Sequence, residues 1–402
     1  MNGGTVSMIA AALVTGATLV AGATASSEAT TAGTSYKVVG KWGKDGSGNS
    51  QFNNPNGIAV SKAGNVYVAD TDNNRVQVFS KSGAYLRKWG SNGPGNGQFK
   101  VAEDVEIAPD GTVWVADQQN QRLQAFSATG GFQSSIELGE LPRAVGVAAD
   151  GSVLAAANGE ERSGFRRWVE RSGSWDAAGG LFGAGEYRAD EVEGSPDGTI
   201  YLVTSRSTPP YDARIRRFTA DGKALGSFKR GDSTTTPGIG VDLDCNVWSP
   251  DHPQRRIVKY SPSGKVLATA SSPDLIARDI AIGPTGDLYV IAQNAGIVRF
   301  AEDKSKPATA NVPAAIKVSG RTAKIAYTLS GVACPKVVGA TATLTGRGVA
   351  GKAAGLKLKA GAKNTITMKL SKAASGKATF KIVLKTNGRP TTETKSVTVN
   401  AR

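Results

Sequence analysis

Apolar and polar residues alternate along most of the chain, in short runs separated by turn residues. Val66/Val68 and Val76/Val78 show this alternation, and Pro109-Asp110-Gly111 is a typical turn between two runs. A period of two is the pattern of β-strands with one buried face. The chain is therefore predicted to be all-β.

The pattern repeats with a step of about 47 residues. One set of residues recurs 47 positions further on: Trp42, Gln51, Phe52, Tyr67, Asp70, Asn73, Arg75, Phe79 and Gly83 return as Trp89, Gln98, Phe99, Trp114, Asp117, Asn120, Arg122, Phe126 and Gly130. A glycine precedes the second run of five units, namely Gly64, Gly111, Gly151, Gly198 and Gly286, and Cys245 takes its place in the remaining unit. Six units of four short strands predict a six-bladed β-propeller over residues 36–302. The last unit lacks a fourth strand, which residues 36–42 should supply and so close the ring.

The first two units resemble the NHL repeat. The resemblance rests on Gly64-Asn65-Val66-Tyr67-Val68-Ala69-Asp70, on Asn73-Asn74-Arg75-Val76-Gln77-Val78-Phe79, and on Asp117-Gln118-Gln119-Asn120-Gln121-Arg122, which repeats the Asp-x-x-Asn-x-Arg core. Unit five keeps Asp251 and Arg255 of this core. The resemblance implies a six-bladed propeller that binds protein or RNA, acts as a sensor or catalyses a lyase reaction, and so does not fix the function. Because the Asp, Asn and Arg recur in successive units, we interpret them as loop braces.

Charge divides the chain in two. Residues 303–402 hold 19 Lys+Arg against 2 Asp+Glu, whereas residues 1–302 hold 29 against 31, although the whole chain has a formal net charge of +15. After a linker at 303–313, about seven alternating runs predict an immunoglobulin-like antiparallel β-sandwich over 314–402.

Lysines dominate the charge of this C-terminal region. Six of them alternate with apolar residues in the predicted strands and are candidates for contact with a polyanion: Lys324, Lys357, Lys359, Lys369, Lys381 and Lys385. Flexible ammonium groups suit diffuse attraction to an anionic cell-wall polymer. Lysines that prevent strand edges from aggregating would give the same pattern. Both interpretations stay open.

The N-terminal segment indicates export. Met8 to Val20 is an apolar run, followed by Ala23-Thr24-Ala25, so residues 1–25 are expected to be a signal peptide and 26–35 a linker. No later run approaches the 18 apolar residues of a membrane helix. The chain is therefore expected to be a secreted or cell-surface protein. Cys245 and Cys334 could then form one disulfide or remain two buried thiols.

Candidate ligand-binding residues lie seven and eight positions before each register glycine, where the inner strands of a propeller begin. This set contains Glu103, Asp104, Arg143, Asp190, Glu191, Arg278 and Asp279, together with Tyr211 from the longer loop of unit four. Carboxylates beside arginines could bind a cation or a sugar, or act as acid and base. Solvated loop charges that pair weakly are the alternative.

The remaining chemistry is sparse. His252 is a weak candidate for catalysis, and with one His and two Cys a multi-His metal centre is excluded. We expect no cofactor except, in an enzyme, a divalent cation. RNA binding is disfavoured because the predicted propeller is slightly acidic. The sequence thus favours a binding scaffold for a protein or carbohydrate ligand, and the alternative is a lyase or lactonase that uses the carboxylate ring and a divalent cation.

Overall fold

The computed structural model describes eight segments of the propeller region and seven strands of the C-terminal region. The segments are 35–158, 163–185, 188–205, 212–230, 238–252, 254–273, 275–293 and 296–302, and the strands lie between residues 315 and 401. The expected signal peptide, most of the linker after it, Tyr211 and Cys334 lie outside these described residues.

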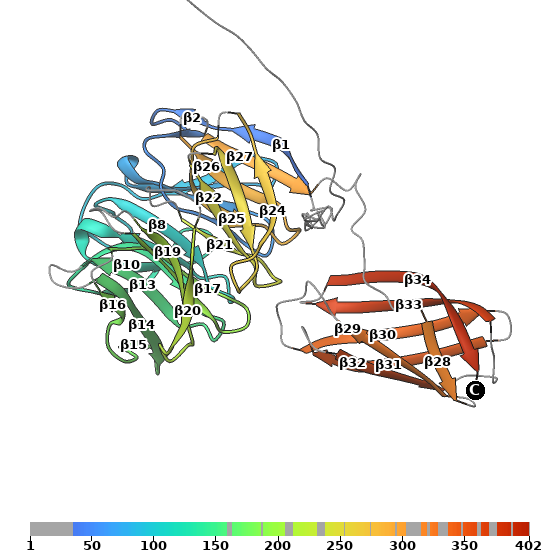
Figure 1. The fold of residues 1–402 in the computed structure, drawn as a ribbon. Helices are drawn as coiled ribbons and strands as arrows, with labels where there is room; N and C mark the ends of the chain where they lie inside the picture. Colours follow the sequence, from blue (N-terminus) through green and yellow to red (C-terminus); the bar gives the residue numbers. More distant parts are fainter. Residues whose placement is uncertain are drawn as a thin grey trace, which may run out of the picture. The chain divides into compact units, whose positions relative to one another are not determined.

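The first three blades are antiparallel sheets in which the chain runs outward strand by strand (Figure 1). Blade 1 holds β4 (Ile58–Val60), β5 (Val66–Asp70), β6 (Arg75–Phe79) and β7 (Tyr85–Trp89). Blade 2 holds β8 (Ala102–Ile107), β9 (Val113–Asp117), β10 (Arg122–Phe126) and β11 (Phe132–Glu137). Blade 3 holds β12 (Leu141–Val147), β13 (Val153–Asn158), β14 (Ser163–Arg171) and β15 (Ser174–Ala177), and β16 (Phe182–Gly185) also pairs with β14.

The remaining blades repeat this plan, and together the sheets form the predicted six-bladed propeller. Blade 4 holds β17 (Arg188–Gly194), β18 (Ile200–Ser205), β19 (Ala213–Phe218) and β20 (Ala224–Lys229). Blade 5 holds β21 (Gly240–Val241), β22 (Val247–Asp251), β23 (Arg256–Tyr260) and β24 (Val266–Ser271). Blade 6 holds β25 (Ala277–Ile282), β26 (Leu288–Ala292), β27 (Gly296–Glu302) and β1 (Tyr36–Trp42). β1 pairs antiparallel with β27, with Tyr36 opposite Glu302 and Trp42 opposite Ile297.

The register glycines lie in the turn between the first and second strands of each blade. Gly64, Gly111, Gly151, Gly198 and Gly286 have φ between 83° and 97°. Side chains other than glycine rarely adopt this region, which explains why glycine recurs there. Cys245 occupies the same turn with φ of 57° and is disulfide-bonded. The other cysteine of the sequence is Cys334.

A buried polar network connects the loop before blade 1 to that blade. The Asp70 carboxylate accepts hydrogen bonds from Asn53 N (2.7 Å), Arg75 Nε (2.7 Å) and Gln77 Nε2 (3.0 Å). Arg75 then donates to the carbonyl oxygens of Ser47, Gly48 and Gln51. Asp117, Arg122 and Gln124 repeat the network in blade 2. This confirms that the recurring Asp, Asn and Arg brace the loops.

Blade 5 keeps part of the brace but with a different arginine from the one expected. Asp251 pairs with Arg256, Oδ2 to Nε at 2.8 Å, five positions on as in Asp70–Arg75. Arg255 is instead the left-handed turn residue, with φ of 48°, and donates to the Pro273 carbonyl. The prediction that Arg255 is the arginine of the Asp-x-x-Asn-x-Arg motif in this unit was therefore wrong by one position.

The C-terminal region contains seven strands, as many as the alternation predicts. In sequence they are β28 (Ala315–Ser319), β29 (Thr322–Thr328), β30 (Val337–Gly346), β31 (Val349–Lys359), β32 (Lys363–Lys369), β33 (Gly376–Thr386) and β34 (Arg389–Ala401). They hydrogen-bond in one path, β31-β30-β33-β34-β28-β29-β32, in which β28 and β34 run parallel. The two-sheet immunoglobulin-like sandwich stays a prediction.

Replacing Asp70 by Ala should destabilise the propeller by about 3–5 kcal/mol, because the buried Arg75 guanidinium would lose its counter-charge. Asp72→Ala is the matched control, since Asp72 is exposed two positions away. Urea unfolding followed by tryptophan fluorescence measures both variants. Equal midpoints for the two variants would contradict the bracing role of Asp70.

Candidate functional site

The inner strands of four blades carry a β-bulge, and a predicted site residue is the extra residue of each bulge. In β8 the register passes from Ala102 to Asp104, so that Glu103 has no partner in β9. The same shift leaves Arg143, Asp190 and Arg278 without partners in β13, β18 and β26. A bulge interrupts the alternation of a strand and can redirect a side chain. We call the end of the propeller where these bulges lie the entry face.

Three of the bulge residues form a mixed-charge cluster on the entry face. Arg143 lies between Glu103 and Asp190, with N–O distances of 3.9 Å to each. Asp190 is also 3.3 Å from Arg188 Nε and accepts a hydrogen bond from Ser205 Oγ at 2.5 Å. Burial raises the pKa of both Glu103 and Asp190, against the attraction of the arginines. Sequence analysis identified Glu103, Arg143 and Asp190 as candidates. It did not identify Arg188 and Ser205.

The other entry-face candidates are held by neighbouring groups. Arg278 donates a hydrogen bond to Asn54 Oδ1, and the His252 Nε2 hydrogen-bonds the Ala277 carbonyl oxygen. Burial lowers the pKa of His252, which therefore favours the neutral imidazole. Nε2 is bonded to the backbone, and no hydrogen bond from His252 to a Ser, Thr or Cys side chain is found within the described segments. Its candidacy for catalysis gains no support.

Arg230, which sequence analysis did not identify, is a further cation near Asp190. Its side chain is only 1% exposed, and burial lowers its pKa to about 10, while Asp190, Tyr260 and Asp251 act in the opposite direction. It follows β20, after the last residue of a regular outer strand, where no motif distinguishes it from a solvent-exposed arginine.

At the position seven before each register residue, acidic and small residues alternate from blade to blade, and the three acids line the central channel. Blades 2, 4 and 6 carry Asp104, Glu191 and Asp279, whereas blades 1, 3 and 5 carry Gly57, Ala144 and Gly238. A Cβ atom at Gly57 would overlap the Asp104 carboxylate, and one at Gly238 would overlap that of Asp279. In these two pairs the glycine of one blade therefore makes room for the acid of the next.

Two of these acids connect neighbouring blades. Asp104 accepts hydrogen bonds from Val105 N (2.7 Å) in its own blade and from Val145 N (2.9 Å) in blade 3. Asp279 likewise accepts from Ile280 N (2.7 Å) and from Ile58 N (2.9 Å) in blade 1. Each carboxylate therefore satisfies backbone donors on both sides of a blade boundary.

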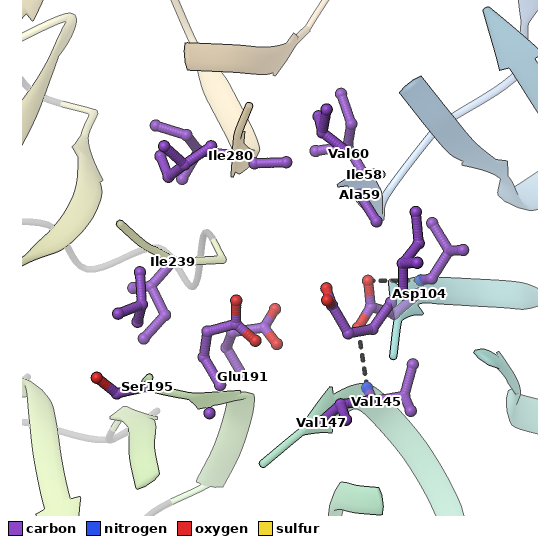
Figure 2. Close-up of a pocket in the computed structure, with 18 of the residues that line it drawn as sticks. Ile58, Ala59, Val60, Asp104, Val145, Val147, Glu191, Ser195, Ile239 and Ile280 are labelled. Carbon is purple, nitrogen blue, oxygen red and sulfur yellow. Dashed lines mark hydrogen bonds between the residues drawn. The ribbon is translucent and has the colours of Figure 1, made fainter. Parts of the chain in front are cut away.

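The channel is a cavity of about 390 Å³ whose wall holds two more acids, Glu106 and Glu193. Asp104 and Glu191 reach into it from different walls (Figure 2). Sequence reasoning missed Glu106 and Glu193, although they stand two positions after Asp104 and Glu191, the spacing that keeps strand residues on one face. Burial raises the pKa of Asp279 to about 7 and that of Glu106 to about 8. The pKa values of Asp104, Glu191 and Glu193 are also raised, by burial and by the neighbouring acids.

The described carboxylates do not assemble a metal site. Within the segments that the structure describes, no three His, Cys, Asp or Glu residues are placed to hold a metal ion. Asp104 and Asp279 use their oxygens on backbone N–H groups instead. The residues present do not fit the divalent cation that the enzyme hypothesis requires.

The six candidate lysines lie in strands β29, β31, β32 and β33, and the pairing of these strands gives their register. Lys357 and Lys385 both stand opposite Gly339, one in each neighbouring strand, and Lys359 and Lys381 stand opposite Val337 and Thr343. On the other side of the sheet path, Lys324 and Lys369 stand opposite Thr367 and Thr322.

Comparison with known proteins supports the repeat assignment. The model of the NHL repeat matches residues 52–79. This chain contains an NHL repeat. A stretch of 45 residues is 49% identical to "Protein lin-41" and one of 45 residues is 47% identical to "B-box type zinc finger protein ncl-1", both of Caenorhabditis elegans. Each match covers 11% of this chain and only 4% and 5% of those relatives.

Solved structures similar to the NHL propeller include a streptogramin B lyase, at 15% identity over 61% of this chain and 78% of that one, with a TM-score of 0.44. A gluconolactonase from Xanthomonas campestris is 13% identical over 65% of this chain and 86% of that one, with a TM-score of 0.47. In the described part of this chain, there is no helix with the length and hydropathy to cross a membrane.

The channel acids should make the propeller less stable as the pH rises. An acid whose pKa is raised on folding keeps a proton that the unfolded chain releases, so the free energy of unfolding should fall between about pH 5 and about pH 8. His252, whose pKa is lowered, contributes with the opposite sign. Glu106→Gln should make the fall shallower because an amide cannot ionise.

Urea unfolding at several pH values measures this slope. The control is Glu137→Gln, which removes an exposed acid from the end of β11. If Glu106→Gln keeps the full pH dependence of the unsubstituted protein, the protonated channel is contradicted.

Proposed function

We propose that the protein is an exported binding scaffold whose entry face recognises a charged group of a protein or carbohydrate ligand. The observation that carries this proposal is the cluster around Arg143. This guanidinium is 26% exposed and stands 3.9 Å from both Glu103 and Asp190, too far for tight pairing. It is therefore free to exchange these contacts for those of a ligand.

The entry face differs in this respect from the channel. Asp104 and Asp279 are committed to backbone donors on both sides of a blade boundary. Arg143, by contrast, reaches the neighbouring blades only through the Glu103 and Asp190 carboxylates at 3.9 Å, and these three side chains carry opposite charges side by side. Such a surface suits a ligand that presents both charges, because charge complementarity gives specificity.

The enzyme alternative, a lyase or lactonase with a divalent cation, receives less support. It requires at least three side chains placed to hold one ion, and no such group is found among the residues that the structure describes. His252, the other candidate for acid–base chemistry, is hydrogen-bonded to the Ala277 carbonyl.

Export is supported by two independent features. Residues 1–25 have the sequence of a signal peptide, and Cys245 is disulfide-bonded. Structural disulfides persist in oxidising compartments outside the cytosol. We therefore place the protein outside the cell or on its surface.

The lysine-rich sheet would act as a tether to anionic cell-envelope polymers. Residues that stand opposite one another in adjacent strands share a face of the sheet. By this rule Lys357, Lys359, Lys381 and Lys385 form one group across β31, β30 and β33. Four lysines at register positions that share one face would attract a polyanion in a salt-dependent way.

Arg143→Glu should abolish ligand capture at the entry face, because it places a third acid between Glu103 and Asp190. The full chain is presented to a glycan array and to proteins shed into culture medium. A ligand of the entry face is one retained by the unsubstituted protein and by Arg171→Glu, an exposed control at the far end of β14, and lost with Arg143→Glu. Ligands retained equally by all three proteins would contradict the proposal. Hydrolysis of gluconolactone that requires added Ca²⁺ would favour the enzyme.

Replacing Lys357, Lys359, Lys381 and Lys385 by Gln should release the full chain from purified bacterial cell walls. Replacing the exposed propeller lysines Lys44, Lys81, Lys88 and Lys265 is the matched control, since it removes the same charge elsewhere. Co-sedimentation is measured from about 0.1 M to about 1 M NaCl, over which the Debye length falls from about 10 to about 3 Å. Equal retention of both variants, or retention unaffected by salt, would contradict the tether.

A further inference from the structure

Blades 2 and 5 contain tryptophans at equivalent positions of the repeat. Trp114 pairs with Ala125 across β9 and β10, and Trp248 pairs with Lys259 across β22 and β23. Both indoles are 1% exposed. The turns that precede them are also equivalent, since Ala108 N bonds to Thr112 O and Asp242 N to Asn246 O. The two sites can therefore be compared residue by residue.

In blade 5 the polar edge of the indole is satisfied by an internal ion pair. Trp248 Nε1 donates to Asp242 Oδ2 at 3.2 Å, and Lys259 Nζ lies 2.9 Å from the same oxygen. Lys259 Nζ is also 5.1 Å from the centre of the Trp248 ring, within reach of a cation–π interaction. Tyr36 packs edge-on against the indole at 4.9 Å.

Blade 2 keeps the aromatic part of this arrangement and lacks the ion pair. Trp175 of β15 packs edge-on against Trp114 at 4.9 Å, as Tyr36 does against Trp248. Ala108 and Ala125 stand where Asp242 and Lys259 stand in blade 5. Among the described residues, no hydrogen bond from Trp114 Nε1 is found, and this atom is not one of the buried side-chain atoms without a partner, as Trp42 Nε1 and Trp89 Nε1 are. Because Trp114 lines a groove, its N–H is open to an acceptor that enters from solvent.

The two alanines open a cavity, which we call the Trp114 groove. Its volume is about 690 Å³, whereas the equivalent cavity beside Trp248 has about 270 Å³. Ala108, Ala125, Trp114 and Trp175 all line it. The space that Lys259 and Asp242 fill in blade 5 is thus part of an accessible groove between blades 2 and 3.

The rim of the Trp114 groove is acidic. Asp110 and Glu170 are exposed lining residues, and Asp110 accepts hydrogen bonds from Thr112. Asp150, the third acid, is paired with Arg167 and accepts from Ser152. No ion pair of Asp110 or Glu170 is found among the described residues, so the rim carries an excess of negative charge. This charge attracts a cationic ligand and repels an anionic one.

We infer that the Trp114 groove binds a primary ammonium group that carries an oxygen acceptor beside it. The ligand ammonium occupies the position in blade 2 that is equivalent to that of Lys259 Nζ in blade 5, near the aromatic pair and the rim carboxylates. The ligand oxygen occupies the position equivalent to that of Asp242 Oδ2 and accepts the hydrogen bond of Trp114 Nε1. An amino sugar has this chemistry, and so does a lysine side chain beside a peptide carbonyl. The groove lies where β8 turns into β9, at the opposite end of β8 from Glu103, and is separate from the entry face.

The test uses two cationic probes and their neutral partners on the full chain. Glucosamine is compared with N-acetylglucosamine, and Nα-acetyl-lysine amide with its Nε-acetylated form, by calorimetry and saturation-transfer NMR. We expect at least one cationic probe to bind on the order of tenfold more tightly than its partner, or about 1.4 kcal/mol. Which of the two probes binds identifies the source of the ammonium. Equal binding of cationic and neutral probes, or no binding, would overturn the inference.

The location is tested by rebuilding blade 5 chemistry in blade 2. Ala108→Asp combined with Ala125→Lys supplies the missing pair from within the chain and should remove probe binding. If this double variant does not fold, Ala125→Met fills the same space without a charge and should weaken binding at least tenfold. Cooperative thermal unfolding and far-ultraviolet circular dichroism establish folding. Undiminished probe binding by a folded variant would overturn the assignment to the Trp114 groove.

Discussion

The propeller depends on satisfying backbone donors where its inner strands converge on the axis. At this point each strand has a neighbour only on its outer side, so N–H groups that face the next blade need another partner. The carboxylates of Asp104 and Asp279 supply it, each accepting one N–H from its own blade and one from the next. The small residues beside them belong to the same arrangement, because a Cβ atom at Gly57 or Gly238 would overlap the Asp104 or the Asp279 carboxylate.

Much of the architecture could be read from the sequence because it depends on local backbone geometry. The first turn needs a positive φ in every blade, which glycine supplies in five of them and Cys245 adopts in blade 5, and the apolar alternation follows from the pleat. The bulges could not be predicted, since two of their extra residues are acids (Glu103 and Asp190) and two are arginines (Arg143 and Arg278), so that no single residue type marks them. The site was located only because each precedes the register glycine by a fixed number of positions. Glu106 and Glu193 were missed because acids in a strand are normally taken to face bulk water, whereas here they line the central channel.

Tertiary partners account for the rest of what the sequence left undetermined. Arg256 and Arg255 are adjacent, and only the pairing of β22 with β23 shows which one reaches Asp251. Trp114 and Trp248 look alike in the repeat, yet the difference between them lies in Ala125 and Lys259 on the next strand. In a repeat protein, candidate sites therefore lie where residues at equivalent positions of the repeats differ. The periodicity predicts the fold, and the positions that break it indicate the sites.

The protonated channel also changes what folding does to the solution around it. Near neutral pH, acids such as Glu106 and Asp279 bind protons that the unfolded chain has already released to the buffer. Folding is then coupled to proton uptake, and the heat of unfolding contains the ionisation heat of whichever buffer accepts those protons. The charge of the folded propeller is correspondingly more positive than its count of acidic and basic residues implies.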